Sequence, residues 1–255
     1  MKNNLVLMPF GTNSIRSKWI TESLHRNFDV VLLGYHPVTD QNILVSPGVE
    51  VFHYYDYKWW MIQDFFNQHP DYLKNYASFF FLDDDIEITK EQINNLFECF
   101  NYLPVQLAQP SLTPDSYMSW KALQHKRLSG LRYVTTVELM CPIMKRSVLE
   151  KLLPTFKLTK SGWGVDLLWG KQVPAYFGEK KIVVLDIIQV RHSKPVGKGE
   201  LYGKLDQPAK TEEDAVRAVH DLFKFKIKEI RSWWNTLPGR LISYYNLSRF
   251  SIKRM

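Results

Sequence analysis

The sequence is short of cysteine, of long apolar runs and of internal repeats, and each shortage excludes a class of protein. Its 255 residues include two cysteines, Cys99 and Cys141, which do not form a C-x-x-C pair. A disulfide-rich scaffold is therefore excluded, and a reducing compartment is expected. No apolar run approaches the ~20 residues that cross a bilayer. The apolar run near the N-terminus ends at Pro9, too early for a secretory signal. We expect a cytoplasmic protein that can be peripherally attached to the inner face of a membrane.

Basic residues are concentrated at the C-terminal end. Residues 216–255 contain nine Lys or Arg and two acids, and subtraction from the totals of 33 and 26 leaves 24 of each sign in residues 1–215. This asymmetry predicts a body over residues 1–210 and a basic amphipathic helical tail over residues 211–255. At 100° per residue, one face of the tail helix gathers its apolar residues. These are Val219, Phe223, Ile227, Ile230 and Trp234.

Two roles for the tail are open at this stage. Its apolar stripe either docks on the body or lies on an anionic membrane, where cations reach the phosphates. A nucleic-acid partner is not expected, because the body has neither a basic stripe nor a recognisable reading motif.

Short apolar runs alternate with helical patterns in the first 85 residues. The predicted strands cover residues 5–8, 30–33, 49–52 and 79–82, and the predicted helices cover residues 14–26 and 57–68. This order is typical of βαβ units, so we expect an α/β fold with a Rossmann-like, mostly parallel central sheet flanked by helices. Further predictions are helices at residues 89–100 and 147–153 and strands at residues 134–141 and 182–190. Ligands of such sheets bind at the carboxyl ends of the strands.

Three consecutive carboxylates, Asp83, Asp84 and Asp85, follow the apolar run at residues 79–82. Neighbouring carboxylates repel one another unless a positive charge lies near them. Hard divalent cations such as Mn²⁺ and Mg²⁺ take carboxylate oxygens together with substrate phosphates. Alternate residues of an extended segment point the same way, so Asp83 and Asp85 can share one site. The alternative is a solvated acidic turn, and the position directly after a buried strand favours the metal site.

Two later segments supply further candidate residues. Asp166 begins a short apolar helix after Gly162 and Gly164, glycines that permit close approach of a substrate, and Trp163 offers a flat face for a sugar ring. Alternatively, Asp166 is only a favourable charge at a helix N-terminus. His192 comes just past a predicted strand, where an imidazole can complete a metal shell or serve a structural role.

Together these segments resemble the GT-A glycosyltransferases, which share the nucleotide-diphospho-sugar transferase fold. The run Asp83-Asp84-Asp85 resembles their DxD motif, Asp166 resembles their C-terminal acidic base, and His192 resembles their late metal-binding histidine. Residues 5–200 are more closely similar to the family known as lysine-ketoglutarate-reductase trans-splicing-related, itself grouped with GT-A enzymes. That family usually has Trp-Asp-Glu-Asp where this chain has Leu82-Asp83-Asp84-Asp85, so the first and last acids are kept. The function in the family's name is not supported by the resemblance.

The resemblance implies a metal-dependent, inverting glycosyltransferase of polysaccharide biosynthesis. Its partners would be a nucleotide-sugar donor and a saccharide or lipid-linked saccharide acceptor. Asp85, with His192 and Asp83, would bind Mn²⁺ or Mg²⁺, and Asp166 would take the acceptor's proton, with Glu138 as a substitute base. The donor would contact Pro9, Phe10, Gly11, Asn13, Asp56, Lys58, Asp83 and Asp84. The acceptor would contact Trp120, Trp163, Gly164 and Trp169. Lys58 can equally be a surface cation, and the tryptophans can equally be core residues.

Two rival functions share these features. A metal-dependent nucleotide-sugar phosphohydrolase or nucleotidyltransferase also places carboxylates beside a diphosphate. A non-catalytic carbohydrate-binding protein of the same fold would keep the cleft without turnover. The products distinguish them, because only the transferase makes a glycoside.

Overall fold

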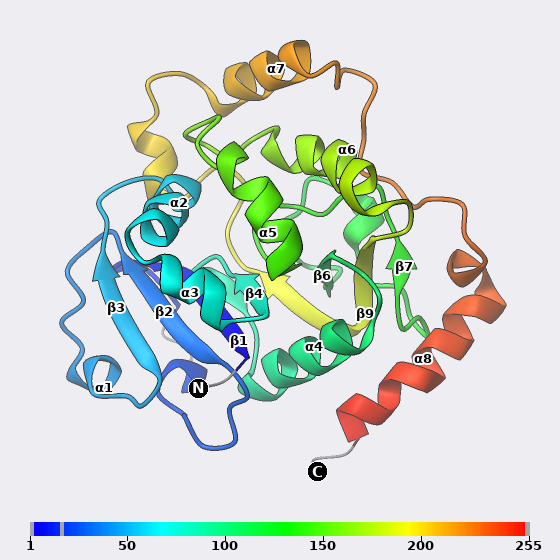
Figure 1. Cartoon of the computed structure of the whole chain (residues 1–255), viewed down its shortest axis with the longest axis horizontal. Coiled ribbons are helices and arrows are strands. Elements are labelled where there is room, and N and C mark those ends of the chain that lie inside the picture. Colours follow the sequence, from blue (N-terminus) through cyan, green and yellow to red (C-terminus); the bar gives the residue numbers. More distant parts are fainter. Residues whose placement is uncertain (1–2, 16–17, 253–255) are drawn as a thin grey trace.

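The computed structural model describes residues 3–15 and 18–252, and these residues build one large mixed sheet with helices around it (Figure 1). The strands are β1 (Asn4–Phe10), β2 (Asp29–Gly34), β3 (Val49–His53), β4 (Ser78–Phe81), β5 (Ile86–Glu87), β6 (Leu107–Leu112), β7 (Arg132–Tyr133), β8 (Ile143–Lys145) and β9 (Ile182–His192). The helices are α1 (Gln41–Leu44), α2 (Lys58–Gln68), α3 (Pro70–Asn75), α4 (Lys90–Tyr102), α5 (Arg146–Leu152), α6 (Val165–Phe177), α7 (Ala209–Val219) and α8 (Leu237–Ile252). Short 3-10 turns include η1 (Lys18–Ile20), η4 (Glu200–Lys204) and η5 (Trp233–Asn235).

The strand order β3-β2-β1-β4-β8-β6-β9-β5, with β7 beside β9, explains where a ligand can bind. Strands β3, β2, β1 and β4 are parallel to one another, as the βαβ pattern predicts. Strand β8 is antiparallel to β4 and β6, so the sheet is mixed beyond β4. The four residues of β4 are all buried, as in a strand covered on both faces. Its carboxyl end delivers Asp83, Asp84 and Asp85 to the edge where parallel-sheet ligands bind.

Several predicted helices form as expected, for local reasons. Thr89 caps α4, and its side chain and that of Gln92 make the reciprocal bonds of a capping box. The inner face of α4 buries apolar side chains, including Leu96 and Phe100. Among the helices that the structure describes, none combines the length and apolarity that crossing a bilayer requires.

Two predicted elements in the body are wrong. In place of a helix over residues 14–26, the described residues form turns and η1, while residues 16 and 17 lie outside the description. The Arg26 guanidinium donates hydrogen bonds to the carbonyls of Ile20 at 3.0 Å and Phe28 at 3.1 Å. These bonds hold the segment in a non-helical conformation. In place of the predicted strand at residues 134–141, the chain leaves the sheet after β7. The Glu138 amide there donates to the Gln109 side chain at 2.8 Å and not to a neighbouring strand.

The single tail helix expected through Val219–Trp234 is also wrong. Helix α7 ends at Val219, and Asp221 adopts a positive φ of 52° that breaks the helical path. The next residues run beside β7, where the Thr135 amide donates to the Lys228 carbonyl at 2.9 Å. Ile227 is therefore buried while Phe223 is exposed, so the predicted apolar face does not exist. The division at residue 210 stays a prediction, and Lys253 and Arg254 of the basic tail lie outside the described residues.

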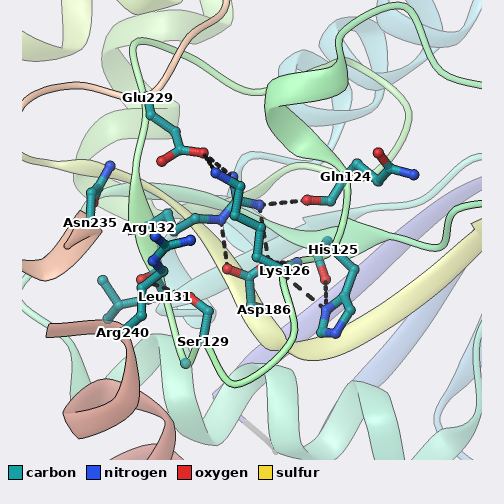
Figure 2. Close-up of polar contacts among 12 residues, drawn as sticks. Gln124, His125, Lys126, Ser129, Leu131, Arg132, Asp186, Glu229, Asn235 and Arg240 are labelled. Carbon is teal, nitrogen blue, oxygen red and sulfur yellow. Dashed lines mark hydrogen bonds and ion pairs between the residues drawn. The ribbon is translucent and has the colours of Figure 1, made fainter. Parts of the chain in front are cut away.

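A buried ionic network fastens the C-terminal segment to the body (Figure 2). Arg132 is fully buried, and its guanidinium pairs with the Asp186 carboxylate on β9 through bonds of 2.7 and 3.0 Å. It also donates to Glu229 at 2.8 Å and to the carbonyls of Ala122 and Gln124 at 2.7 Å each. One side chain thus joins β9, the loop before β7 and the C-terminal segment.

Arg132→Met is expected to destabilise the fold strongly. The substitution fills similar volume but leaves the Asp186 carboxylate, whose side chain has no exposed surface, without its main partner. Removing one partner of a buried pair costs about 3–5 kcal/mol, which corresponds to a Tm decrease of roughly 6–20 °C for a chain of this size. Thermal unfolding followed by circular dichroism measures it. The matched control is Arg231→Met, at an exposed position of the same segment, which should keep the wild-type Tm. A similar Tm for both variants would contradict the assigned importance of the network.

Candidate active site

A cleft of about 260 Å³ opens at the carboxyl end of β4 and gathers most of the predicted functional residues. The predicted residues that line it are Pro9, Lys58, Asp83, Asp84, Asp85, Trp120, Glu138, Trp163, Gly164, Asp166 and His192. They come from β1, α2, β9, the N-terminal end of α6 and the segments that follow β4, β6 and β7. Segments more than 100 residues apart in sequence therefore build one concave wall.

Five predicted contact residues do not line this cleft. Trp169 is fully buried, and its indole N–H donates to Thr155 Oγ1 at 2.9 Å, so it is a core residue and not an acceptor platform. Phe10 is likewise a core residue. Gly11 packs against the Tyr35 ring, the Asn13 carbonyl accepts from Lys194, and the Asp56 carboxylate accepts from the Tyr57 amide. Each of these residues thus has a contact outside the cleft.

Asp85 and His192 have the features of a pair that holds a divalent cation. Their facing atoms, Oδ1 and Nε2, lie 3.3 Å apart, and both side chains are buried. The other ring nitrogen of His192 contacts the Tyr117 carbonyl at 2.7 Å, an outer contact that directs Nε2 toward Asp85 as in many metal-binding histidines. Asp85 Oδ1 is buried and accepts no hydrogen bond from any described residue. An oxygen and a nitrogen presented in this way fit a hard or borderline cation.

Asp83 is engaged by Lys58 and does not complete a three-residue metal group. Lys58 Nζ lies 2.5 Å from Asp83 Oδ1 and 2.7 Å from the Leu139 carbonyl, so Lys58 is a cation of the cleft wall. Burial raises the pKa of Asp83 to about 6, against the opposing charge of Lys58. Within residues 3–15 and 18–252, no three His, Cys, Asp or Glu side chains meet as a metal-binding group. A cation held by Asp85 and His192 would need further oxygens from a ligand or water.

Asp84 is held by hydrogen bonds to Tyr35 of the cleft wall and to the loop after β1. Its Oδ2 accepts from the Tyr35 hydroxyl at 2.7 Å and also from Ser14. The Ile15 amide donates to the Asp84 carbonyl at 2.8 Å. These bonds fix the loop after β1 against the acidic run.

Asp166 lies at the start of α6 and is partly buried in the wall of the cleft. Gly164 caps this helix with a φ of 87°, a conformation that L side chains rarely adopt. Gly162 has a φ of 81°, and a Cβ there would lie 2.8 Å from the Trp59 ring. Both glycines thus serve the backbone and its packing. Burial raises the pKa of Asp166 to about 7, a value suited to a general base at neutral pH.

Glu138 is buried at the floor of the cleft with one oxygen unpartnered. Its Oε1 accepts from the Ser119 amide at 3.0 Å, while Oε2 has no hydrogen-bond partner among the described residues. Burial raises the pKa of Glu138 to about 8, and the nearby Asp166 adds to that shift. The carboxyl group is therefore mostly protonated at pH 7 and can donate a hydrogen bond into the cleft.

Glu138→Gln is expected to stabilise the protein at alkaline pH. A folded-state pKa near 8 means that the folded protein holds a proton that the unfolded chain releases above about 4.5. This stabilising contribution is complete below the unfolded-state pKa and is lost as the pH rises through 8. Glutamine keeps the shape without the titration, so its Tm at pH 8.5 should exceed that of the wild type by roughly 10 °C, about 4–5 kcal/mol for a pKa of 4.5 in the unfolded chain and about 8 in the folded one. Melting curves of both proteins between pH 5 and 9 measure the effect. An equal gain from Glu179→Gln, at an exposed position, would contradict it.

The segment between β9 and α7 closes one side of the cleft, and sequence reasoning missed it. Tyr202 in η4 accepts a hydrogen bond from the Trp163 indole at 3.0 Å and contacts the Ser161 carbonyl at 3.3 Å. Glu200 pairs with His36 at 2.8 Å, and the Tyr57 hydroxyl donates to the Lys204 carbonyl. No motif marks these residues, because each is placed by contacts distant in sequence.

Comparison with known proteins gives a family and a fold. The family model described as "Protein of unknown function (DUF707)" matches residues 1–138, which is more than half of the chain. No curated protein matches the sequence. The structure of GalNAc-T7 with UDP, GalNAc and Mn²⁺ is similar over 97% of this chain, with a TM-score of 0.63 and 12% identity. The match covers 54% of GalNAc-T7, so this chain spans about half the length of that structure.

A second similar structure is S. aureus TarS 1-349 in complex with UDP-GlcNAc. It is similar over 98% of this chain and 80% of its own length, with a TM-score of 0.52 and 13% identity. Both similarities concern the fold, which is the mixed α/β fold of GT-A glycosyltransferases. By its sequence, the chain belongs to the DUF707 family.

Proposed function

We propose that this protein is a divalent-metal-dependent glycosyltransferase that moves a sugar from a nucleotide-sugar donor to a saccharide or lipid-linked acceptor. The observation that carries the proposal is a single cleft lined by Asp85, whose Oδ1 faces His192 Nε2 at 3.3 Å, and by the carboxyl of Asp166. Two proteins of similar fold form complexes with UDP or UDP-GlcNAc, one of them with Mn²⁺, which supports this substrate class. The closer resemblance to the lysine-ketoglutarate-reductase trans-splicing-related family stays a prediction.

The donor diphosphate would lie between the acidic run and the wall formed by Pro9 and Lys58. Asp85 and His192 would hold the cation, which when bound supplies positive charge to the leaving diphosphate. Lys58 adds a second positive charge close by and keeps Asp83 oriented through their ion pair. Burial on the protein side strengthens each of these interactions, because the local dielectric is lower than that of water.

Asp166 is proposed to accept the proton of the acceptor hydroxyl. As that oxygen forms its bond to the anomeric carbon, the bond from that carbon to the diphosphate breaks and the diphosphate leaves. A base on the face opposite the leaving group gives inversion. Protonated Glu138 would donate a hydrogen bond to a sugar hydroxyl, while Trp120 and Trp163 offer ring faces on the cleft wall. Acid–base help of this kind contributes about 10²–10⁴ in rate.

A panel of nucleotide sugars, each with and without Mn²⁺, tests the proposed function. A donor present at about 100 times its Kd stabilises the folded protein by about 2.7 kcal/mol, and the shift in Tm should be larger with the metal. The donor found in this way is then incubated with saccharide acceptors, and the products are identified by mass spectrometry. A glycoside supports the proposal. Free sugar phosphate would favour a phosphohydrolase. A new nucleotide would favour a nucleotidyltransferase, and a donor that stays intact would favour a non-catalytic binding protein.

A further inference from the structure

Helix α8 presents an uncovered apolar side at the edge of the molecule. Its exposed apolar residues are Leu237, Leu241, Ile242, Tyr244 and Tyr245, and Trp233 of η5 lies just before them. Tyr245 is 79% exposed and Leu237 is 62% exposed, which is unusual for large side chains on one helix. Figure 1 shows α8 along the outer edge of the fold, away from α2 and α3. An exposed apolar patch of this kind marks an interaction surface.

The opposite side of α8 is already engaged by the body, so the uncovered side is held outward. Leu247 is buried in the core, and the Ser243 hydroxyl accepts from the Gly130 amide at 3.0 Å. Asn235, just before the helix, accepts from the Tyr133 amide at 2.8 Å and donates to the Tyr133 carbonyl at 2.8 Å. Together with the Arg132–Glu229 pair, these contacts fix the rotation of α8 about its own axis.

Exposed cations precede this apolar side. In the stretch that leads to α8, Ile227 is buried while Lys226 and Lys228 beside it are exposed, as expected when alternate side chains of an extended segment point outward. Lys224 is exposed in the turn that precedes them. Arg231 is also exposed, and none of these four cations forms an ion pair with a described residue. The nine basic and two acidic residues of positions 216–255 make this the one strongly positive part of the sequence.

From this combination we infer that α8 and the lysine stretch form a docking surface for an anionic lipid bilayer. Aliphatic and aromatic side chains of such a surface enter the headgroup boundary, and neighbouring cations meet lipid phosphates. A second copy of the chain is a poorer occupant, because pairing this surface with itself would bring two sets of cations together. The inference concerns the surface and does not depend on the proposed reaction.

Co-sedimentation of the full chain with vesicles tests the inference. One set of vesicles is pure phosphatidylcholine and the other is an equal mixture with phosphatidylglycerol. At an ionic strength of about 0.1 M, we expect binding to the anionic vesicles at least tenfold stronger than to the neutral ones. At about 1 M, where the screening length falls to about 3 Å, most of this difference should disappear. Each cation near such a surface contributes about 1 kcal/mol, roughly a fivefold change in binding.

Replacing the three lysines Lys224, Lys226 and Lys228 by Gln removes three such contributions. Binding to the anionic vesicles should therefore weaken on the order of 100-fold.

Matched variants separate this surface from general charge and apolarity. The control variant replaces Lys74, Lys121 and Lys151 by Gln, which changes the net charge equally at other exposed sites. It should keep most of its affinity for the anionic vesicles. Leu241→Glu with Tyr245→Glu should abolish binding, whereas Val45→Glu, at a distant position that is 75% exposed, should preserve it. Unchanged melting curves show that the variants fold. Equal binding by both lysine variants, or no binding by the wild type, would overturn the inference. So would a concentration-dependent dimer, measured by light scattering, that Leu241→Glu with Tyr245→Glu dissolves in the absence of lipid binding.

Discussion

Asp85→Asn is expected to lower glycosyl transfer by about 10³-fold or more while the protein stays folded. The buried Asp85 Oδ1 faces His192 Nε2 at 3.3 Å and accepts no well-aligned hydrogen bond from a described residue, so asparagine can replace it without breaking such a bond. Asparagine keeps the shape but removes the anion that would hold a cation beside His192. The loss of one well-placed electrostatic contact costs about 10²–10³ in rate, and loss of the cation adds to that.

Two measurements separate this effect from general damage. The extra Tm shift that Mn²⁺ adds to donor binding should vanish in Asp85→Asn, while the Tm without ligand changes little. Glu87→Gln is the control, because Glu87 lies two residues further on, at an exposed position paired with Arg191 at 2.7 Å. Near wild-type turnover of Asp85→Asn with Mn²⁺ present would show that the cation is not held by this residue.

Asp166→Asn is the second large effect, with turnover expected to fall about 10²–10⁴-fold. Donor affinity should stay close to that of the wild type, because the role assigned to Asp166 is toward the acceptor. A base with a pKa of about 7 is protonated and inactive below that pH, so wild-type turnover should rise as the pH passes from 6 to 8. The remaining activity of the variant should lack this rise.

Initial rates over a pH series, together with donor titrations, provide the measurement. Asp214→Asn serves as the control, since Asp214 is exposed on α7 and pairs with Lys210 at 2.9 Å. Equal losses in donor affinity and turnover would identify Asp166 as a binding residue and not as the base.

The candidate site is partly predictable because some of its residues follow local patterns. Asp85 belongs to an acidic run that follows a continuous apolar strand, and Asp166 begins an apolar helix after two glycines. Such patterns reflect the periodicity of apolar residues and the local backbone conformation, and both depend mainly on residues close in sequence. The exclusion of Trp169 from the cleft was not predictable, because an aromatic residue in a buried helix has the same local signal whether it faces a core or a ligand. Its contact with Thr155 settles the matter.

Local sequence was sufficient for the four parallel strands β1 to β4, for the capped helix α4 and for the acidic run at a strand end. Contacts between distant segments were needed for the rest. Lys58 became the partner of Asp83, and the tail helix expected through Val219–Trp234 gave way to an extended stretch pinned by Thr135 and Arg132. The physical reason is that a buried charge or an unpaired backbone group must find a partner wherever the fold offers one. That requirement outweighs the weak helical preference of a short amphipathic segment.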